Sequence, residues 1–151
     1  MKTRALATLF AGERARFARW YPVCAGAWLT LTDEPCPLPP CAARDYGVAN
    51  LETLEICFAF RVLTLPRENV VALVRHELGH IADPTPNAKN AERRADRIAA
   101  RVGGAAIRYD ANMVQTIDPA APYRVRPASL HRWLSSGLYS RPWTTTTAHT
   151  V

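Results

Sequence analysis

The sequence contains no long hydrophobic run, and this absence limits where the protein can reside. None of its apolar stretches approaches the ~18 residues that a membrane-spanning helix needs. The amino-terminal stretch MKTRALATLFAGERARF is a poor secretory signal because its apolar part is short, is interrupted by Thr and Gly, and is followed at once by Glu and Arg. We therefore expect no contact with a membrane and a cytoplasmic location, in the host or in a cell infected by a phage.

Closely spaced cysteines are also scarce. Of the 4 cysteines, Cys36 and Cys41 lie near each other in CPLPPC, whereas Cys24 and Cys57 stand apart. A zinc ribbon needs two such pairs, so this class of metal site is not predicted. We expect four reduced and mostly buried thiols, with a Cys36–Cys41 disulfide or a second metal site as the alternatives.

Lysine is nearly absent, and the net charge of +6 comes almost entirely from arginine. The arginines are spread along the whole chain, and we find no RNA- or DNA-binding motif among them. A solvated basic surface is the simplest interpretation, although such a surface can also bind nucleic acid or an acidic protein. The length of 151 residues and the hydrophobic fraction of 48% fit one globular domain, 1–151, with a core of its own.

The order of the predicted elements indicates an α+β fold. The expected elements are a helix at 3–21, a strand at 23–32, a proline-rich loop at 33–47, a strand or hairpin at 51–65, and helices at 66–83 and 87–102. Gly103 and Gly104 offer a cap for the last of these helices. Beyond these glycines the sequence pattern is less distinct. It indicates a short helix at 127–137 and a tail at 138–151 that we expect to be loop or disordered.

The helix predicted at 66–83 carries polar residues where an ordinary amphipathic helix would not. At 100° per residue, Val70, Val74, Leu78 and Ile81 form one apolar stripe. His76 and His80 lie side by side along its edge. Glu77 falls inside the apolar arc, which is costly for a carboxylate without compensation, whereas a surface acid would lie near Arg75 on the other side.

The helix predicted at 87–102 has its acids on the apolar face. Glu92 and Asp96 share that face with alanines, while the arginines at 93, 94, 97 and 101 lie opposite. Glu92 and Asp96 are four residues apart, a spacing at which like charges repel unless a cation lies beside them. The two acids therefore predict a bound cation on the inward side of this helix.

The heights of these side chains match if the two helices are antiparallel neighbours, as their short proline-rich connection favours. At 1.5 Å per residue, Glu92 lies roughly level with His80, and Asp96 roughly level with His76. Two imidazoles and one carboxylate then converge on a point whose fourth side is open. Asp83, three residues after His80, is the alternative third ligand.

This arrangement matches a catalytic zinc site, in which three protein ligands leave one position for water. We predict one Zn²⁺ per chain, held by His76, His80 and Glu92. Glu77 follows the first ligand and would act as general base. Asp96 would accept a hydrogen bond from the other ring nitrogen of a ligand histidine, most readily His76.

The segments HELGH and AERRADRIAA resemble the gluzincin metallopeptidases, whose pattern is H-E-x-x-H followed by E-x-x-A-D on the next helix. Among gluzincins, they are most similar to the ImmA/IrrE-type metallo-endopeptidases of phages and mobile elements. The resemblance covers roughly 54–102. It implies a zincin-like minimal metallopeptidase fold, with a small twisted sheet packed against an active-site helix and a second helix that bears the glutamate. It also implies the same roles for His76, Glu77, His80, Glu92 and Asp96.

The expected function is hydrolysis of a peptide bond in a protein or peptide substrate, which the resemblance suggests is a transcriptional repressor. Tyr109, Tyr123 and His131 are candidates for stabilising the oxyanion, and no spacing singles one out. Two other functions remain open. One is a non-catalytic interaction module whose helices are joined by zinc, and the other is a small basic nucleic-acid-binding protein.

Overall fold

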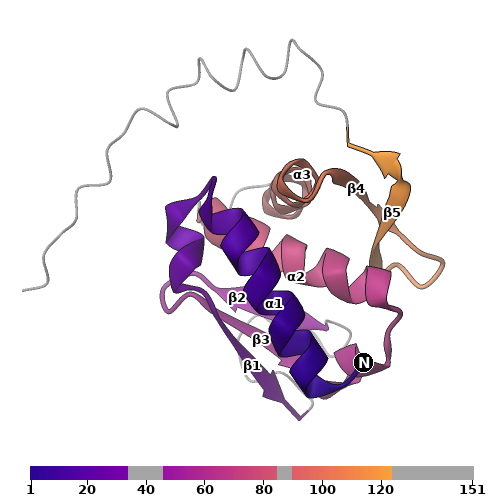
Figure 1. The fold of residues 1–151 in the computed structure, drawn as a ribbon, viewed down its shortest axis with the longest axis horizontal. Helices are drawn as coiled ribbons and strands as arrows, with labels where there is room; N and C mark the ends of the chain where they lie inside the picture. Colours follow the sequence, from indigo (N-terminus) through magenta and orange to yellow (C-terminus); the bar gives the residue numbers. More distant parts are fainter. Residues whose placement is uncertain (34–45, 85–89, 124–151) are drawn as a thin grey trace, which may run out of the picture.

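A computed structural model of the chain describes residues 1–33, 46–84 and 90–123 (Figure 1). The elements in these ranges are α1 (Thr3–Ala18), the 3₁₀ helix η1 (Pro22–Gly26), β1 (Trp28–Thr32), β2 (Gly47–Asn50), β3 (Glu55–Ala59), the 3₁₀ helix η2 (Phe60–Thr64), α2 (Arg67–Ala82), α3 (Ala91–Gly103), β4 (Ala105–Tyr109) and β5 (Gln115–Pro122). They confirm the α+β class. Among the described helices, none has the length and apolar character to cross a membrane. The predictions for Cys36, Cys41, His131, the helix at 127–137 and the tail fall outside the described residues.

The larger sheet has the strand order β1-β3-β2, with β1 parallel and β2 antiparallel to β3. The central strand β3 is buried from Ile56 to Ala59, as a strand covered on both faces must be. Figure 1 shows this sheet on one side of α2, with α3 on another side. The sheet therefore supports α2, the helix that carries both histidines of the motif.

Two predicted strands are shorter in the structure than in the sequence interpretation. The segment at 23–32 begins as η1, with Pro22 at its first position, so the strand starts at Trp28. The segment at 51–65 holds the single strand β3, and η2 follows it directly. The Asn50 side-chain oxygen accepts the backbone N–H groups of Glu52 and Thr53, which turns the chain before β3.

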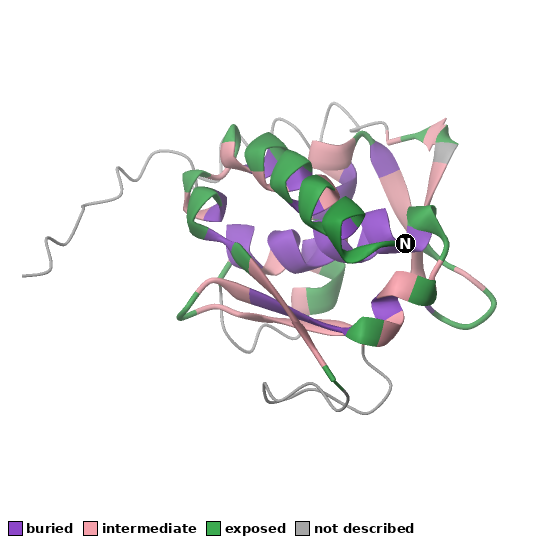
Figure 2. Ribbon diagram, turned by 60° about the horizontal axis from the view of Figure 1, so that its bottom comes forward, coloured by how far each residue is buried: buried purple, intermediate pink, exposed green. Residues whose placement is uncertain are grey.

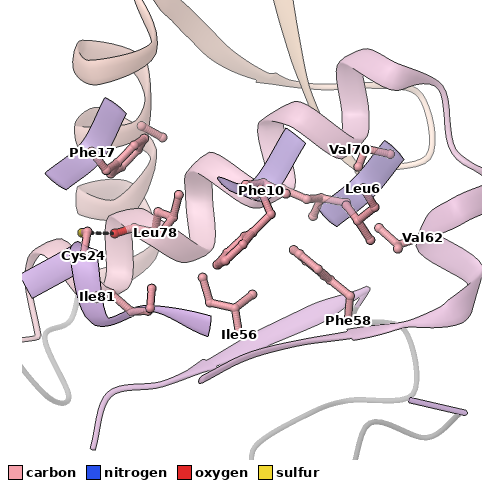
Figure 3. Close-up of a cluster of buried hydrophobic side chains, with 14 of the residues drawn as sticks. Leu6, Phe10, Phe17, Cys24, Ile56, Phe58, Val62, Val70, Leu78 and Ile81 are labelled. Carbon is pink, nitrogen blue, oxygen red and sulfur yellow. Dashed lines mark hydrogen bonds between the residues drawn. The ribbon is translucent and has the colours of Figure 1, made fainter. Parts of the chain in front are cut away.

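The core lies between α1, α2 and β3. Figure 3 shows side chains from all three elements meeting there, and its largest fully buried members include Leu6, Phe17, Ile56, Phe58, Val70 and Leu78. Cys24 lies at the edge of this cluster with its thiol directed at the Leu78 carbonyl, Cys57 is also buried, and neither of the two forms a disulfide. For these two cysteines the prediction of burial is confirmed.

The helix α2 is buried on nearly every side, as Figure 2 shows. Arg75 of this helix is buried, although the helical projection places it on the solvent side. The guanidinium donates to both carboxylate oxygens of Glu13 in α1, at 3.0 and 2.9 Å, and to the Gly103 carbonyl at the end of α3, at 3.3 Å. Both charged residues are buried. This ion pair joins the three α-helices one residue before His76.

A hairpin of β4 and β5, absent from the sequence interpretation, covers the start of α2. The Asp110 carboxylate accepts the backbone N–H groups of Asn112 and Val114, which closes the turn. The buried amide of Asn69 in α2 donates to Asp110 and to the Gln115 carbonyl, at 2.9 and 3.0 Å. The turn is therefore held against α2 in one position.

Candidate metal centre

The two histidines lie on successive turns of α2 and direct their rings to one point. The Nε2 atoms of His76 and His80 are 3.1 Å apart, and the ring planes are nearly perpendicular, at 88°. His76 is buried, while His80 is partly exposed. A four-residue spacing on a helix places side chains on one face, so this convergence follows from the sequence of the motif.

Glu92 approaches the rings from the first turn of α3. One carboxylate oxygen lies 3.0 Å from Nε2 of His76, and the other lies 3.4 Å from Nε2 of His80. The side chain stays 71% exposed, so the carboxylate closes the centre from the solvent side instead of entering the core as its helix face predicted. His76, His80 and Glu92 thus form a three-residue group that can hold a metal ion.

The spacing of the three donor atoms fits a tetrahedral zinc ion. Zinc bonds of ~2.0–2.1 Å at tetrahedral angles set neighbouring donors ~3.3–3.4 Å apart. The two Nε2 atoms are 3.1 Å apart, and each lies 3.0 or 3.4 Å from one of the two oxygens of Glu92. Two imidazole nitrogens and a carboxylate oxygen are all lone-pair donors when the rings are neutral. They repel one another at these distances unless a proton or a cation lies between them.

Asp96 fixes which nitrogen of His76 is free to bind. Its Oδ1 lies 2.8 Å from Nδ1 of His76, and its Oδ2 accepts the Tyr109 hydroxyl at 2.9 Å. A proton on Nδ1 leaves the lone pair of a neutral ring on Nε2, the atom that faces His80 and Glu92. The carboxylate therefore sets both the tautomer and the orientation that a metal ligand requires.

Without a metal, the acids around His76 favour its charged form. Burial by itself lowers the pKa of this imidazole, but hydrogen bonds to Asp96 and Glu92, with the nearby charge of Glu77, raise the pKa to about 10. Hydrogen bonds with His76 and His80 hold the pKa of Glu92 well below its usual range. The site thus stabilises positive charge, whether a proton or a cation supplies it.

This shift predicts how the metal-free protein responds to pH. An unfolded histidine has a pKa of ~6.5, so the raised folded value adds stability that is complete below ~6.5 and is lost as the pH rises toward about 10. We expect the free energy of unfolding to fall by about 1 kcal/mol per pH unit above ~6.5. Urea unfolding of chelator-treated protein measures this slope. His76→Gln should remove it, and an unchanged slope in that variant would assign the effect to another group.

The close approach of α3 to α2 depends on Gly79, the glycine inside the motif. A Cβ atom at this position would lie 2.6 Å from the Ala95 carbonyl oxygen and 2.9 Å from its Cα. Both are backbone atoms, so no side-chain rotation relieves the contact. Gly79 and Ala95 therefore allow the two helix backbones to touch, which brings Glu92 within reach of the histidines.

Gly79→Ala should push the helices apart. We expect a loss of about 1–3 kcal/mol in the free energy of unfolding, as in other overpacked interiors, together with weaker zinc binding. Thermal unfolding and a zinc-competition assay measure the two effects. Gly12→Ala is the matched control, because it is also a helical glycine but nothing lies within 4 Å of its added Cβ. That control should be stabilised by about 0.5–1 kcal/mol; equal behaviour of the two variants would refute this role of Gly79.

A cleft of about 770 Å³ opens above the three donors. Glu77 is buried and lines the cleft together with His76, His80 and Glu92. One wall is built by residues 46–49 at the strand β2, and the other by residues 112–115 at the β4–β5 turn. Met113 in that turn is 74% exposed and has a positive φ of 61°. The cleft thus combines a polar floor with walls from two separate sheets.

The remaining sequence candidates lie elsewhere. Asp83 accepts a hydrogen bond from Arg94 Nε at 2.8 Å and is not part of the three-residue group. Tyr109 donates to Asp96, and neither it nor Tyr123 lines the cleft among the residues that the structure describes. His131 lies outside those residues. The sequence interpretation missed the contributions of Asn69 and Met113, and the turn-forming run Asp-Ala-Asn at 110–112 was the available signal for them.

Comparison of the chain with models of known protein families, with curated proteins and with solved structures finds no match. The functional inference therefore depends on the geometry of the site and on the sequence motif that forms it.

Proposed function

We propose that the protein is a zinc-dependent metallopeptidase of the gluzincin type, with a zincin-like arrangement of its sheet and two central helices. The observation that carries this proposal is the meeting of three zinc-type donors with the buried Glu77 in one open cleft. A purely structural zinc site is usually closed by four protein ligands and has no use for an additional acid. The open side and the acid together favour catalysis.

Each residue then has a defined task. His76, His80 and Glu92 would hold the ion, and Asp96 would keep the His76 ring in its binding orientation. A zinc ion in such a site acidifies the attacking water and polarises the scissile carbonyl. Glu77 would accept the proton of that water and pass it to the leaving amine.

The shape of the cleft supports a polypeptide substrate. Within the described ranges, β2 pairs with β3 alone, so its second edge offers backbone hydrogen-bonding groups beside the cleft. An extended peptide can add to such an edge as a further strand. A protein cut at one exposed segment suits this open cleft, and a transcriptional repressor is the partner that the ImmA/IrrE resemblance suggests.

Zinc-dependent cleavage of a peptide library tests this function. The purified protein should cut a subset of peptides, with products identified by mass spectrometry. Cleavage should stop after treatment with a chelator and return after addition of about one zinc per chain. A library left intact by protein with bound zinc would contradict the peptidase assignment and favour a zinc-joined interaction module.

A further inference from the structure

A chain of hydrogen bonds leads from the second sheet to the metal centre. Tyr109, the last residue of β4, donates its hydroxyl to Oδ2 of Asp96 at 2.9 Å. The other oxygen of the same carboxylate lies 2.8 Å from Nδ1 of His76. The opposite nitrogen of that ring faces Glu92 and His80. Tyr109 is thus connected to the metal ligands through a single carboxylate.

Burial does not explain the presence of Tyr109, because the residue is 46% exposed. Desolvation and the Asp96 carboxylate raise the pKa of its phenol to about 12. The hydroxyl therefore stays protonated near neutral pH and remains a hydrogen-bond donor. The hydroxyl is directed at Asp96. Tyr109 is not among the described residues that line the cleft. The hydrogen bond therefore affects Asp96, which orients a histidine of the metal centre, and does not contact a substrate in the cleft.

The Asp96 carboxylate needs such a partner. Arg93 is exposed and lies three residues before Asp96 on α3, a spacing at which side chains can meet, so its guanidinium can attract a carboxylate that rotates away from His76. When both oxygens are bound, one to Tyr109 and one to His76, a single rotamer satisfies the two contacts. A fixed hydrogen-bond partner of this kind orients a ligand imidazole and raises metal affinity.

We infer that Tyr109 is a positioning residue of the metal centre: its hydroxyl holds Asp96 in the orientation that fixes the His76 ring, and it thereby strengthens zinc binding without touching the ion or the substrate. This inference rests on the metal site of the proposed function. It does not depend on the reaction that the site performs.

The hydroxyl has two opposing effects on zinc affinity. The hydrogen bond from Tyr109 withdraws charge from Asp96, which makes the carboxylate a weaker acceptor for His76 and lowers zinc affinity. The same bond restricts the rotation of the carboxylate, which raises zinc affinity. Because Oδ1 and Oδ2 have separate partners, the hydroxyl does not compete with His76 for one oxygen. The restriction of rotation therefore outweighs the withdrawal of charge, and loss of the hydroxyl should weaken zinc binding.

The test is a zinc-competition titration at one neutral pH against a chromophoric chelator. Removal of a direct partner of a ligand histidine costs 10–100-fold in affinity, so Asp96→Ala should fall in that range. Tyr109→Phe acts one step further away and should weaken binding by about three- to tenfold. In the Asp96→Ala background, the same change at Tyr109 should have no further effect. Tyr123→Phe is the matched control and should bind zinc as the wild type does.

Two further measurements separate positioning from a general effect on the fold. Tyr109→Phe keeps the ring and loses one hydrogen bond of about 1 kcal/mol, so the thermal midpoint of the metal-free protein should fall by no more than a few degrees. The visible spectrum of the cobalt-substituted protein should change with Tyr109→Phe and stay constant with Tyr123→Phe. Unchanged zinc affinity in Tyr109→Phe, or an equal loss with and without Asp96, would overturn the inference. If zinc affinity follows this pattern but the protein cuts no peptide, the peptidase proposal is refuted and the inference about Tyr109 stands.

Discussion

Glu77→Gln should reduce peptide cleavage by about 10³-fold or more while zinc remains bound. General base catalysis contributes ~10²–10⁴-fold, and the amide of glutamine cannot accept a proton from water near neutral pH. Glu77 is not one of the three donors that face one another, so its replacement by a residue of the same shape leaves those donors in place. The measurements are kcat/KM on a peptide selected from the library and the zinc content of the purified variant.

Glu68→Gln supplies the matched control for this experiment. Glu68 lies in the first turn of the same helix and is exposed, so the variant should retain wild-type activity and zinc. Full activity in Glu77→Gln would exclude Glu77 as the base. Loss of zinc together with activity would instead give Glu77 a structural role and would leave the catalytic assignment without support.

His80→Ala should abolish stoichiometric zinc binding. Structural zinc sites contribute ~10–16 kcal/mol in all, so one of three protein donors accounts for roughly 3–5 kcal/mol, or about 10³-fold in affinity. Because His80 is partly exposed, the truncation leaves little cavity, and the variant should fold. Metal analysis after dialysis should find about one zinc per chain in the wild type and almost none in the variant.

Asp83→Asn is the control for ligand identity. Asp83 was the rival third ligand in the sequence, but the structure pairs it with Arg94. The variant should therefore keep its zinc, whereas Glu92→Gln should lose most of its affinity. The reverse outcome would show that Asp83 is the third ligand and that the Glu92 carboxylate does not bind the metal.

The metal centre could be predicted from the sequence because every part of it is local to two helices. The 100° step of a helix fixes which residues share a face, and its rise fixes their heights. An antiparallel pair with a short connection then leaves few ways to combine His76, His80 and Glu92. Their meeting in the structure needed no information about the rest of the chain.

The parts that could not be predicted depend on partners far apart in the sequence. The hairpin of β4 and β5 consists of short strands without a clear alternation, and prolines interrupt the second one. Its position depends on Asn69, which belongs to a different segment. Arg75 was likewise assigned to the surface, because its buried partner Glu13 lies 62 residues earlier and no local pattern connects the two.

The buried Arg75 has a consequence for the way the chain is made. Glu13 emerges early from the ribosome, the guanidinium follows, and the Gly103 carbonyl that completes its contacts emerges after both. A buried charge needs partners for its donors, and the contacts of Arg75 are completed only when α3 has packed beside α1 and α2. Glu92 also belongs to α3. Packing of the three helices and the capacity to load zinc should therefore arise together, once translation has passed this point.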